Sequence, residues 1–146
     1  MGYKARVIQP WYGEILGEVL ITSSRISFLG DVDMSTGAIV GADLDIRGHN
    51  IQGKILLFSE SRGSTVGSNV LYGLSRNGVA PKLIGTRRVE PITASGAIFG
   101  SIPMVSELEE TIFRELKNGD SVCARMDGGR ACLERAEDGT FDNDYL

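Results

Sequence analysis

A short segment rich in glycine and hydroxyl side chains, Arg62 to Ser68, is the part of the sequence best suited to chemistry. It reads Arg-Gly-Ser-Thr-Val-Gly-Ser and lies between an apolar run and an amphipathic segment. At a junction between a strand and a helix, free backbone N–H groups and the helix dipole attract phosphate or carboxylate. The glycines permit close backbone approach and the hydroxyls add donors. These residues are Gly63, Gly67, Ser64, Thr65 and Ser68.

The pattern alone leaves two interpretations open, an anion-binding loop and a hydroxyl-rich helix cap. The loop is not a nucleotide-binding P-loop, because Gly63 and Gly67 are one residue too close and no Gly-Lys-Ser/Thr follows. It also lacks the Gly-x-Ser-x-Gly spacing of a nucleophile elbow. If the loop is catalytic, Ser64 is the best candidate for a proton carrier, and Arg62 is the nearest cation that could lower its proton affinity.

Composition narrows the classes of protein that this chain can be. Its 146 residues fit one domain over 1–146, with 42% hydrophobic and 23% charged residues, as in a globular protein. A net charge of −4 argues against a nucleic-acid partner. No apolar run reaches the ~18 residues of a membrane span, and the N-terminus has no signal-peptide pattern. We therefore expect a cytoplasmic protein without a membrane partner.

Metal ligands are scarce in this sequence. Cys123 and Cys132 are the two cysteines and His49 is the one histidine. A structural zinc site needs four ligands and an iron–sulfur cluster needs several cysteines, so we expect this chain to hold no metal by itself. We interpret the cysteines as reduced and structural, with a disulfide across a hairpin as the alternative.

The elements that must position the loop follow from apolar patterning. We expect strands over 17–22, 25–29, 38–40, 54–58, 81–85 and 102–105, and a hairpin of 122–126 with 130–134. A helix is expected over 69–78, ending at Gly78, and another over 106–116 with Ser106 and Glu109 as a capping box. The order strand, loop, helix, strand over 54–85 predicts a right-handed βαβ unit. The fold class is thus α/β, a compact β-rich layer with a central βαβ unit, and 137–146 is expected to be a loose tail.

Over residues 17–105 the sequence resembles the swivel domain, or small subunit, of the aconitase X family. Each matching segment is weak alone, but all of them occur in order. They are 17–20, 26–30, 32–33, 36–37, 53–56, 62–68, 77–81, 96–98 and 102–103. The resemblance implies a swivelling β/β/α fold and a hydro-lyase that is active only with a larger partner subunit.

The resemblance also implies how the chemistry is divided. The large subunit would carry the iron–sulfur cluster, expected to have four irons and four sulfurs, as the Lewis acid on the leaving hydroxyl. Ser64 of this chain would remove a proton from the adjacent carbon. The remaining loop residues would contact substrate oxygens or lie near the anion, and these are Gly63, Thr65, Ser68 and Arg62.

Two branches of the family differ in this loop. In bacterial members that dehydrate cis-3-hydroxy-L-proline, the sequence of this loop resembles Gly-Ser-Cys-Ser/Thr-Gly-Ser. The segments 63–68 and 77–82 here are more similar to an archaeal branch that dehydrates mevalonate 5-phosphate to trans-anhydromevalonate 5-phosphate, a step towards isoprenoids. A further alternative, from another functional class, is that this chain is a non-catalytic interaction module. The roles of Arg87, Arg88 and Trp11 stay open, as substrate contacts, partner contacts or ordinary surface residues.

His49 is expected to be a surface or loop residue. Many relatives carry a His-Pro pair in the second motif, where this chain has the segment 42–48 instead. A swivel domain that carries a phosphohistidine would need a Gly-Ser-His sequence. His49 instead follows Arg47-Gly48, so this chain does not fit that class.

Overall fold

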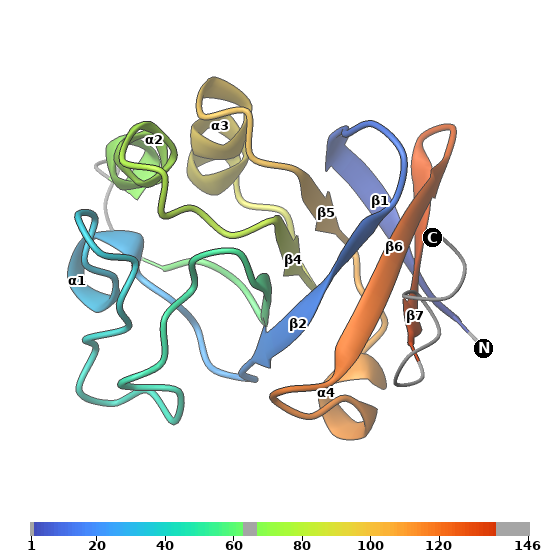
Figure 1. Ribbon diagram of the computed structural model, residues 1–146, viewed down its shortest axis with the longest axis horizontal. Coiled ribbons are helices and arrows are strands. Elements are labelled where there is room, and N and C mark those ends of the chain that lie inside the picture. Colours follow the sequence, from blue (N-terminus) through green and yellow to red (C-terminus); the bar gives the residue numbers. More distant parts are fainter. Residues whose placement is uncertain (1, 63–66, 137–146) are drawn as a thin grey trace, which may run out of the picture.

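In the computed structural model, which describes residues 2–62 and 67–136, seven strands close into a barrel in the order β1-β5-β4-β3-β2-β6-β7. Helices α2 and α3 lie side by side on one flank of the barrel and α4 lies near its far end (Figure 1). The strands are β1 (Gly2–Gln9), β2 (Ile15–Ile21), β3 (Ile55–Phe58), β4 (Leu83–Thr86), β5 (Met104–Ser106), β6 (Ser121–Asp127) and β7 (Arg130–Arg135). The helices are α1 (Phe28–Asp31), α2 (Gly67–Arg76), α3 (Pro91–Phe99) and α4 (Ile112–Glu115). In the described part of the chain, no helix is long and apolar enough to span a membrane.

Four neighbouring strands of the barrel, β2, β3, β4 and β5, are parallel to one another. The other contacts, made by β1, β6 and β7, are antiparallel. Helix α2 follows β3 and precedes β4, and these two strands are paired directly with Ile55 opposite Leu83. Since parallel strands end at the same edge of a sheet, the segments that follow β2, β3, β4 and β5 all leave the barrel at one end.

Alternate residues of the parallel strands feed two separate cores. In β3, Ile55 and Leu57 join a cluster to which all seven strands contribute, which is the barrel interior. Leu56 and Phe58 join a second cluster beneath the three helices α1, α2 and α3. Successive strand side chains point to opposite faces, so a strand between two cores must be apolar throughout. The strand expected over 54–58 is found at Ile55–Phe58, and all four of its residues are buried.

Helix α2 agrees closely with its sequence pattern. Val70, Leu71 and Leu74 form its buried face. It ends at Arg76, and Gly78 two residues later has a φ of 72°, in the left-handed region. The N–H groups of Val79 and Gly78 donate to the carbonyls of Leu74 (3.0 Å) and Ser75 (3.1 Å), the paired bonds of a Schellman motif. The terminal hairpin is confirmed as well, with Asp127 opposite Arg130 across a two-residue turn.

Two of the expected strands are not formed. The segment 25–29 is not a strand, because Ile26 makes a single bridge to Ser61 and Phe28 begins the short helix α1. The segment 38–40 makes only isolated bridges. Both segments cover the outer core, where Ile26, Phe28 and Ile39 are buried without a strand partner along their length.

The expected helix over 106–116 is also wrong. Ser106 is the last residue of β5, and α4 spans only Ile112–Glu115. Ser106 is completely buried and its hydroxyl lies 2.9 Å from the Thr86 hydroxyl, so it is unavailable as a helix cap. Glu107, with a φ of 57°, turns the chain sharply after the strand. The sequence reading also missed β1 and α3.

Candidate active site

The glycine–serine loop connects β3 to α2 at the carboxyl end of the parallel strands. Arg62 is exposed, and its backbone N–H donates to the Ile26 carbonyl at 3.0 Å. Gly67 begins α2, and Ser68 lies half-buried in its first turn. Three of the proposed site residues, Gly63, Ser64 and Thr65, lie outside the described residues. The structure thus defines both ends of the loop, at the edge where parallel α/β sheets bind their ligands.

Helices α2 and α3 begin at this same end and run parallel. A Cβ added to Gly67 would lie 3.9 Å from Ile92 Cγ2, and one added to Gly96 would lie 2.9 Å from Ser68 Cα. At the other end, the Ser75 hydroxyl donates to the Gly100 carbonyl at 2.6 Å. The positive ends of two helix dipoles therefore lie side by side next to the loop (Figure 1).

The structure shows how the N-terminus of α3 is capped. The carboxylate of Glu90 accepts the N–H groups of Ile92 and Thr93, both at 3.0 Å, and so caps α3. The first turn of α2 contains no acidic residue. The dipole of α3 is thus compensated within the chain, while the start of α2 is electrostatically suited to an external anion.

A hydroxyl pair ties the approach to the loop to α3. The hydroxyl of Thr93, which is buried, donates to the hydroxyl of Ser61, one residue before Arg62. The sequence reading missed this contact and the Glu90 cap. A usable signal was present in Glu90-Pro91, since proline is favoured in the first turn of a helix.

Several charged side chains gather around this end of the barrel. Arg25 pairs with Glu60 at 3.4 Å, and Arg87 approaches Glu110 at 3.9 Å. Arg62 and Arg88 are exposed, and neither makes an ion pair with any side chain in 2–62 or 67–136. Among the described residues, those near the ends of the loop thus include two exposed arginines without an ion-pair partner and the start of a helix.

The cysteines are free and lie on the terminal hairpin, away from the loop. The Cys123 thiol donates to Glu14 at 3.0 Å, and burial followed by this hydrogen bond raises the pKa of Cys123 to about 12. Burial also raises the pKa of Cys132. An iron–sulfur cluster binds thiolates, whereas the raised pKa values of Cys123 and Cys132 favour the protonated thiols. Within the described ranges, no three His, Cys, Asp or Glu side chains are arranged to hold a metal, so these residues do not fit a cluster.

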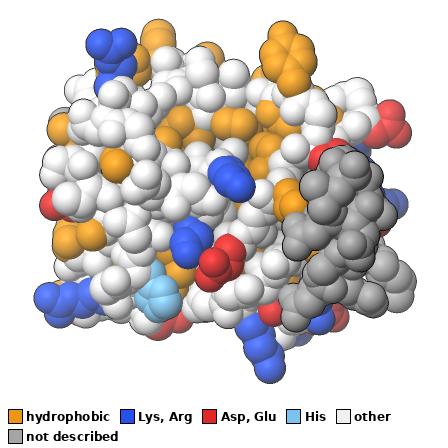
Figure 2. Space-filling model, in the orientation of Figure 1, with side chains coloured by type: hydrophobic (Ala, Val, Ile, Leu, Met, Phe, Trp, Pro, Cys, Tyr) orange, Lys and Arg blue, Asp and Glu red, His pale blue; other side chains and the backbone are white. Residues whose placement is uncertain are grey.

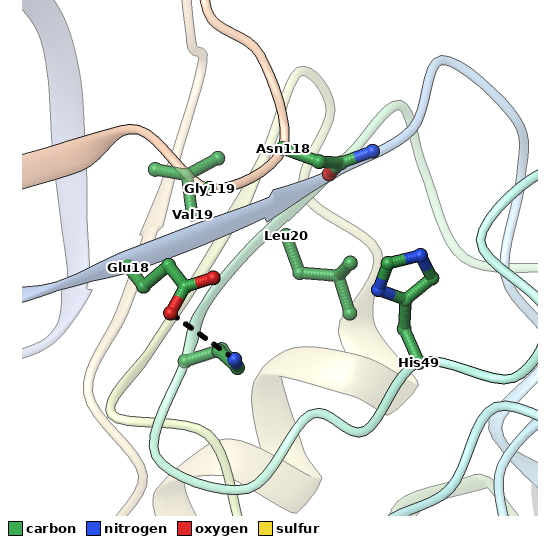
Figure 3. A pocket seen from close by; sticks show the side chains of 7 residues that line it. Glu18, Val19, Leu20, His49, Asn118 and Gly119 are labelled. Atoms are coloured by element: carbon green, nitrogen blue, oxygen red, sulfur yellow. Dashed lines mark ion pairs between the residues drawn. The ribbon is translucent and has the colours of Figure 1, made fainter.

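A small pocket of about 120 Å³ lies away from the loop, beside Lys54, which directly precedes β3. Glu18 and Lys54 form an ion pair at 3.3 Å on its wall, and the His49 ring points towards Leu20 (Figure 3). His49 is exposed and lies in a loop, as expected. On this face of the molecule, acidic, basic and histidine side chains gather below an apolar area (Figure 2). The pocket is at the amino end of β3, so His49 is remote from the glycine–serine loop.

The described residues form a small, β-rich domain, a closed barrel of seven strands with helices on one flank. The chain belongs to the aconitase X swivel domain family, whose sequence model matches residues 3–134. It is 52% identical over 93 residues to the phosphomevalonate dehydratase small subunit of Pyrococcus abyssi, covering 64% of this chain and 72% of that protein.

Two further relatives extend the match. The phosphomevalonate dehydratase small subunit of Methanosarcina acetivorans is 45% identical over 131 residues, covering 90% of this chain and 88% of that protein. The crystal structure of aconitase X from Thermococcus kodakaraensis, in its holo-form, superposes with a TM-score of 0.84 at 42% identity, covering 94% of this chain and 99% of that chain. The resemblance that the sequence motifs indicated is thereby confirmed.

Proposed function

We propose that this chain is the small subunit of a hydro-lyase that dehydrates (R)-5-phosphomevalonate to trans-anhydromevalonate 5-phosphate, a step of archaeal isoprenoid biosynthesis by the mevalonate pathway. The observation that carries the proposal is the start of α2, which has no acidic residue and directly follows the glycine–serine loop. Such a helix start suits a phosphorylated substrate. The names of the relatives, at 41–52% identity, support the same substrate.

In this proposal Ser64 is the proton acceptor. Its oxygen takes the proton from the carbon next to the one that bears the leaving hydroxyl. The electrons of that C–H bond form the new double bond as the hydroxyl leaves as hydroxide. The proton taken up by Ser64 then completes the released water and restores the serine oxygen. A serine oxygen can act as a base only where its negative charge is stabilised, and the α2 N-terminus and the Arg62 guanidinium are the groups of this chain suited to that role.

The other loop residues orient the substrate. Backbone N–H groups at Gly63 and hydroxyls of Thr65 and Ser68 would bind substrate oxygens, with Gly67 permitting the close approach. The expected four-iron–four-sulfur cluster belongs in this proposal to the large subunit, where it supplies a Lewis acid. The whole chain, 1–146, acts as one swivel domain of a cytoplasmic complex.

The decisive experiment is to purify this chain together with its large subunit and assay the complex on two substrates. Formation of trans-anhydromevalonate 5-phosphate from mevalonate 5-phosphate supports the proposal. Turnover of cis-3-hydroxy-L-proline in its place would assign the chain to the other branch of the family. A complex that dehydrates neither substrate would favour the non-catalytic interaction module.

A further inference from the structure

We propose that Arg88 is a second binding residue for the phosphate group of the substrate, alongside Arg62, and that the buried hydroxyls of Thr86 and Ser106 position it. This inference rests on the function proposed above, because it names the group that recognises the phosphorylated end of that substrate. It assigns a role to a residue outside the glycine–serine loop.

The segment that carries Arg88 borders both ends of the loop. On the β3 side, the backbone N–H groups of Arg87 and Arg88 donate to the Ser59 carbonyl, at 3.0 and 3.4 Å. On the α2 side, Ile92 lies against Gly67, with its Cγ2 3.9 Å from the place of a Cβ there. The chain from 87 to 92 therefore runs from the segment that precedes the loop to Gly67, which follows it. Arg88 thus lies in the stretch between its contact with Ser59 and Ile92, which lies against the first residue of α2.

Two buried hydroxyl groups hold this segment in place. Thr86 and Ser106 are 1% and 0% exposed, and each is the last residue of its strand, β4 and β5. The Thr86 hydroxyl donates its one proton to the Arg88 carbonyl at 2.9 Å. The contact between the two hydroxyls, at 2.9 Å, must then be donated by Ser106.

This chain of hydrogen bonds runs from Ser106 through Thr86 to the backbone of Arg88. Buried hydroxyls cost free energy unless they are bonded, so the pair has a strong preference for this one arrangement. Its effect is to anchor the Arg88 backbone two residues beyond the strand, with the side chain left exposed. A fixed backbone reduces the entropy that the residue loses when it binds a ligand.

The charges around Arg88 indicate an anionic ligand. Its neighbour Arg87 approaches Glu110 at 3.9 Å, whereas Arg88 has no ion-pair partner among the described side chains. Arg62, the residue directly before the loop, is also exposed and has no ion-pair partner among the described side chains. A guanidinium group can bind two phosphate oxygens at once, and two such groups match the charge of a phosphate dianion.

The first test compares Arg88→Gln with Arg87→Gln in the complex of small and large subunits. Since a hydrogen bond to a charged group is strong, Arg88→Gln should raise KM for mevalonate 5-phosphate about 10- to 100-fold and leave kcat within about 3-fold. Inhibition by inorganic phosphate should weaken by a similar factor. Arg87→Gln should change KM and the inhibition by phosphate by less than about 2-fold each. An unchanged KM and phosphate inhibition in Arg88→Gln would overturn the role of Arg88.

The second test addresses positioning. Thr86→Val should raise KM as Arg88→Gln does, though less, and Thr86→Ser should restore it because the hydroxyl returns. In an Arg88→Gln background, Thr86→Val should have little further effect on KM, because both changes act through one side chain. Ser106→Ala gives the same comparison if Thr86→Val fails to fold. Additive effects on KM would contradict the positioning role.

The outcomes for the two proposals are distinguishable. If the complex does not dehydrate mevalonate 5-phosphate, the proposed function fails, whatever the variants do. Calorimetric titration of the complex with inorganic phosphate then still tests Arg88. Phosphate binding that Arg88→Gln weakens and Arg87→Gln does not would support an anion site, and binding that neither change affects would refute it.

Discussion

Ser68 at the start of α2 and Gly96 in the middle of α3 are in direct contact, so close that a Cβ on Gly96 would lie 2.9 Å from Ser68 Cα. The same Cβ would lie 2.8 Å from Leu71 Cδ1. No side chain fits between these helices at this point. The backbone of α3 therefore determines where α2 begins, and with it where the anion-binding end of α2 lies.

Gly96→Ala should force α2 away from α3. Because part of the clash is with backbone, we expect a loss of about 1–3 kcal/mol in the free energy of unfolding, and reduced turnover in the complex. Gly30→Ala is the matched control, since Gly30 lies in α1 with open space around its Cα and alanine favours helix. Chemical denaturation measures the free energy of unfolding of the two variants. Equal stability of the two variants would show that the helix contact is more adaptable than the structure indicates.

Ser64→Ala should abolish turnover without preventing assembly with the large subunit. Loss of the proton acceptor should lower kcat at least about 100-fold, while KM changes little. Ser35→Ala removes an exposed hydroxyl that bonds to Asp33, remote from the loop, and should retain activity. Steady-state kinetics on the purified complex, with size-exclusion chromatography as the check on assembly, measure the effect. Full activity in Ser64→Ala would refute its catalytic role.

Cys123 should react slowly with alkylating reagents at neutral pH. Its pKa is raised to about 12, firstly by burial and then by Glu14, so the folded protein keeps the thiol protonated. In a Cys132→Ala background, the alkylation rate of the folded protein should rise about tenfold per pH unit from pH 7 to 10. In the unfolded chain it should level off near pH 9. A plateau in the folded protein near pH 9 would contradict the raised pKa.

The same shift has a consequence for stability. The pKa of Cys123 in the folded protein lies above the unfolded value of 9.0. The contribution of its thiol to the free energy of unfolding is therefore fully present below pH 9. It is lost as pH rises towards about 12, and Cys123→Ala should remove this part of the decline in the free energy of unfolding.

Phe58→Ala should be among the most damaging single changes. Phe58 is completely buried at the end of β3, and its ring meets that of Phe28 edge to face, with centroids 5.7 Å apart. We expect a loss of about 3–5 kcal/mol in the free energy of unfolding. Phe99→Ala, at a side chain that is 75% exposed, should change stability by less than about 0.5 kcal/mol. Urea denaturation monitored by circular dichroism compares the two, and similar midpoints would count against the two-core description.

His49→Ala should leave catalysis unchanged. His49 lines a pocket beside Lys54, at the amino end of β3, whereas the glycine–serine loop follows the carboxyl end. Both kcat and KM of the complex should stay within about 2-fold of the unmodified protein. A drop of tenfold or more in kcat/KM would mean that this pocket takes part in the reaction.

The sequence alone determined those elements whose signals are local. The apolar run of β3, the buried face of α2 with its stop at Gly78, and the terminal hairpin with its two-glycine turn were all predicted correctly. So was the family, since ordered motifs carry that information regardless of geometry. Hydrogen bonding within a helix or across a tight turn depends on residues only a few positions apart, so local patterning suffices.

Only the tertiary structure decided the rest. In β1, apolar Tyr3, Ala5 and Val7 alternate with charged residues and face the barrel interior, a local strand signal that the prediction missed. The structure adds the partners, because β5 and β7 pair with β1 on either side. Ser106, which reads as a helix cap, is buried beside Thr86 because the closed barrel brings β5 against β4. The course of 87–92 between Ser59 and Gly67, and the contact of Ser68 with Gly96, likewise join residues distant in sequence. Such contacts follow from how apolar faces are buried together, which no local pattern specifies.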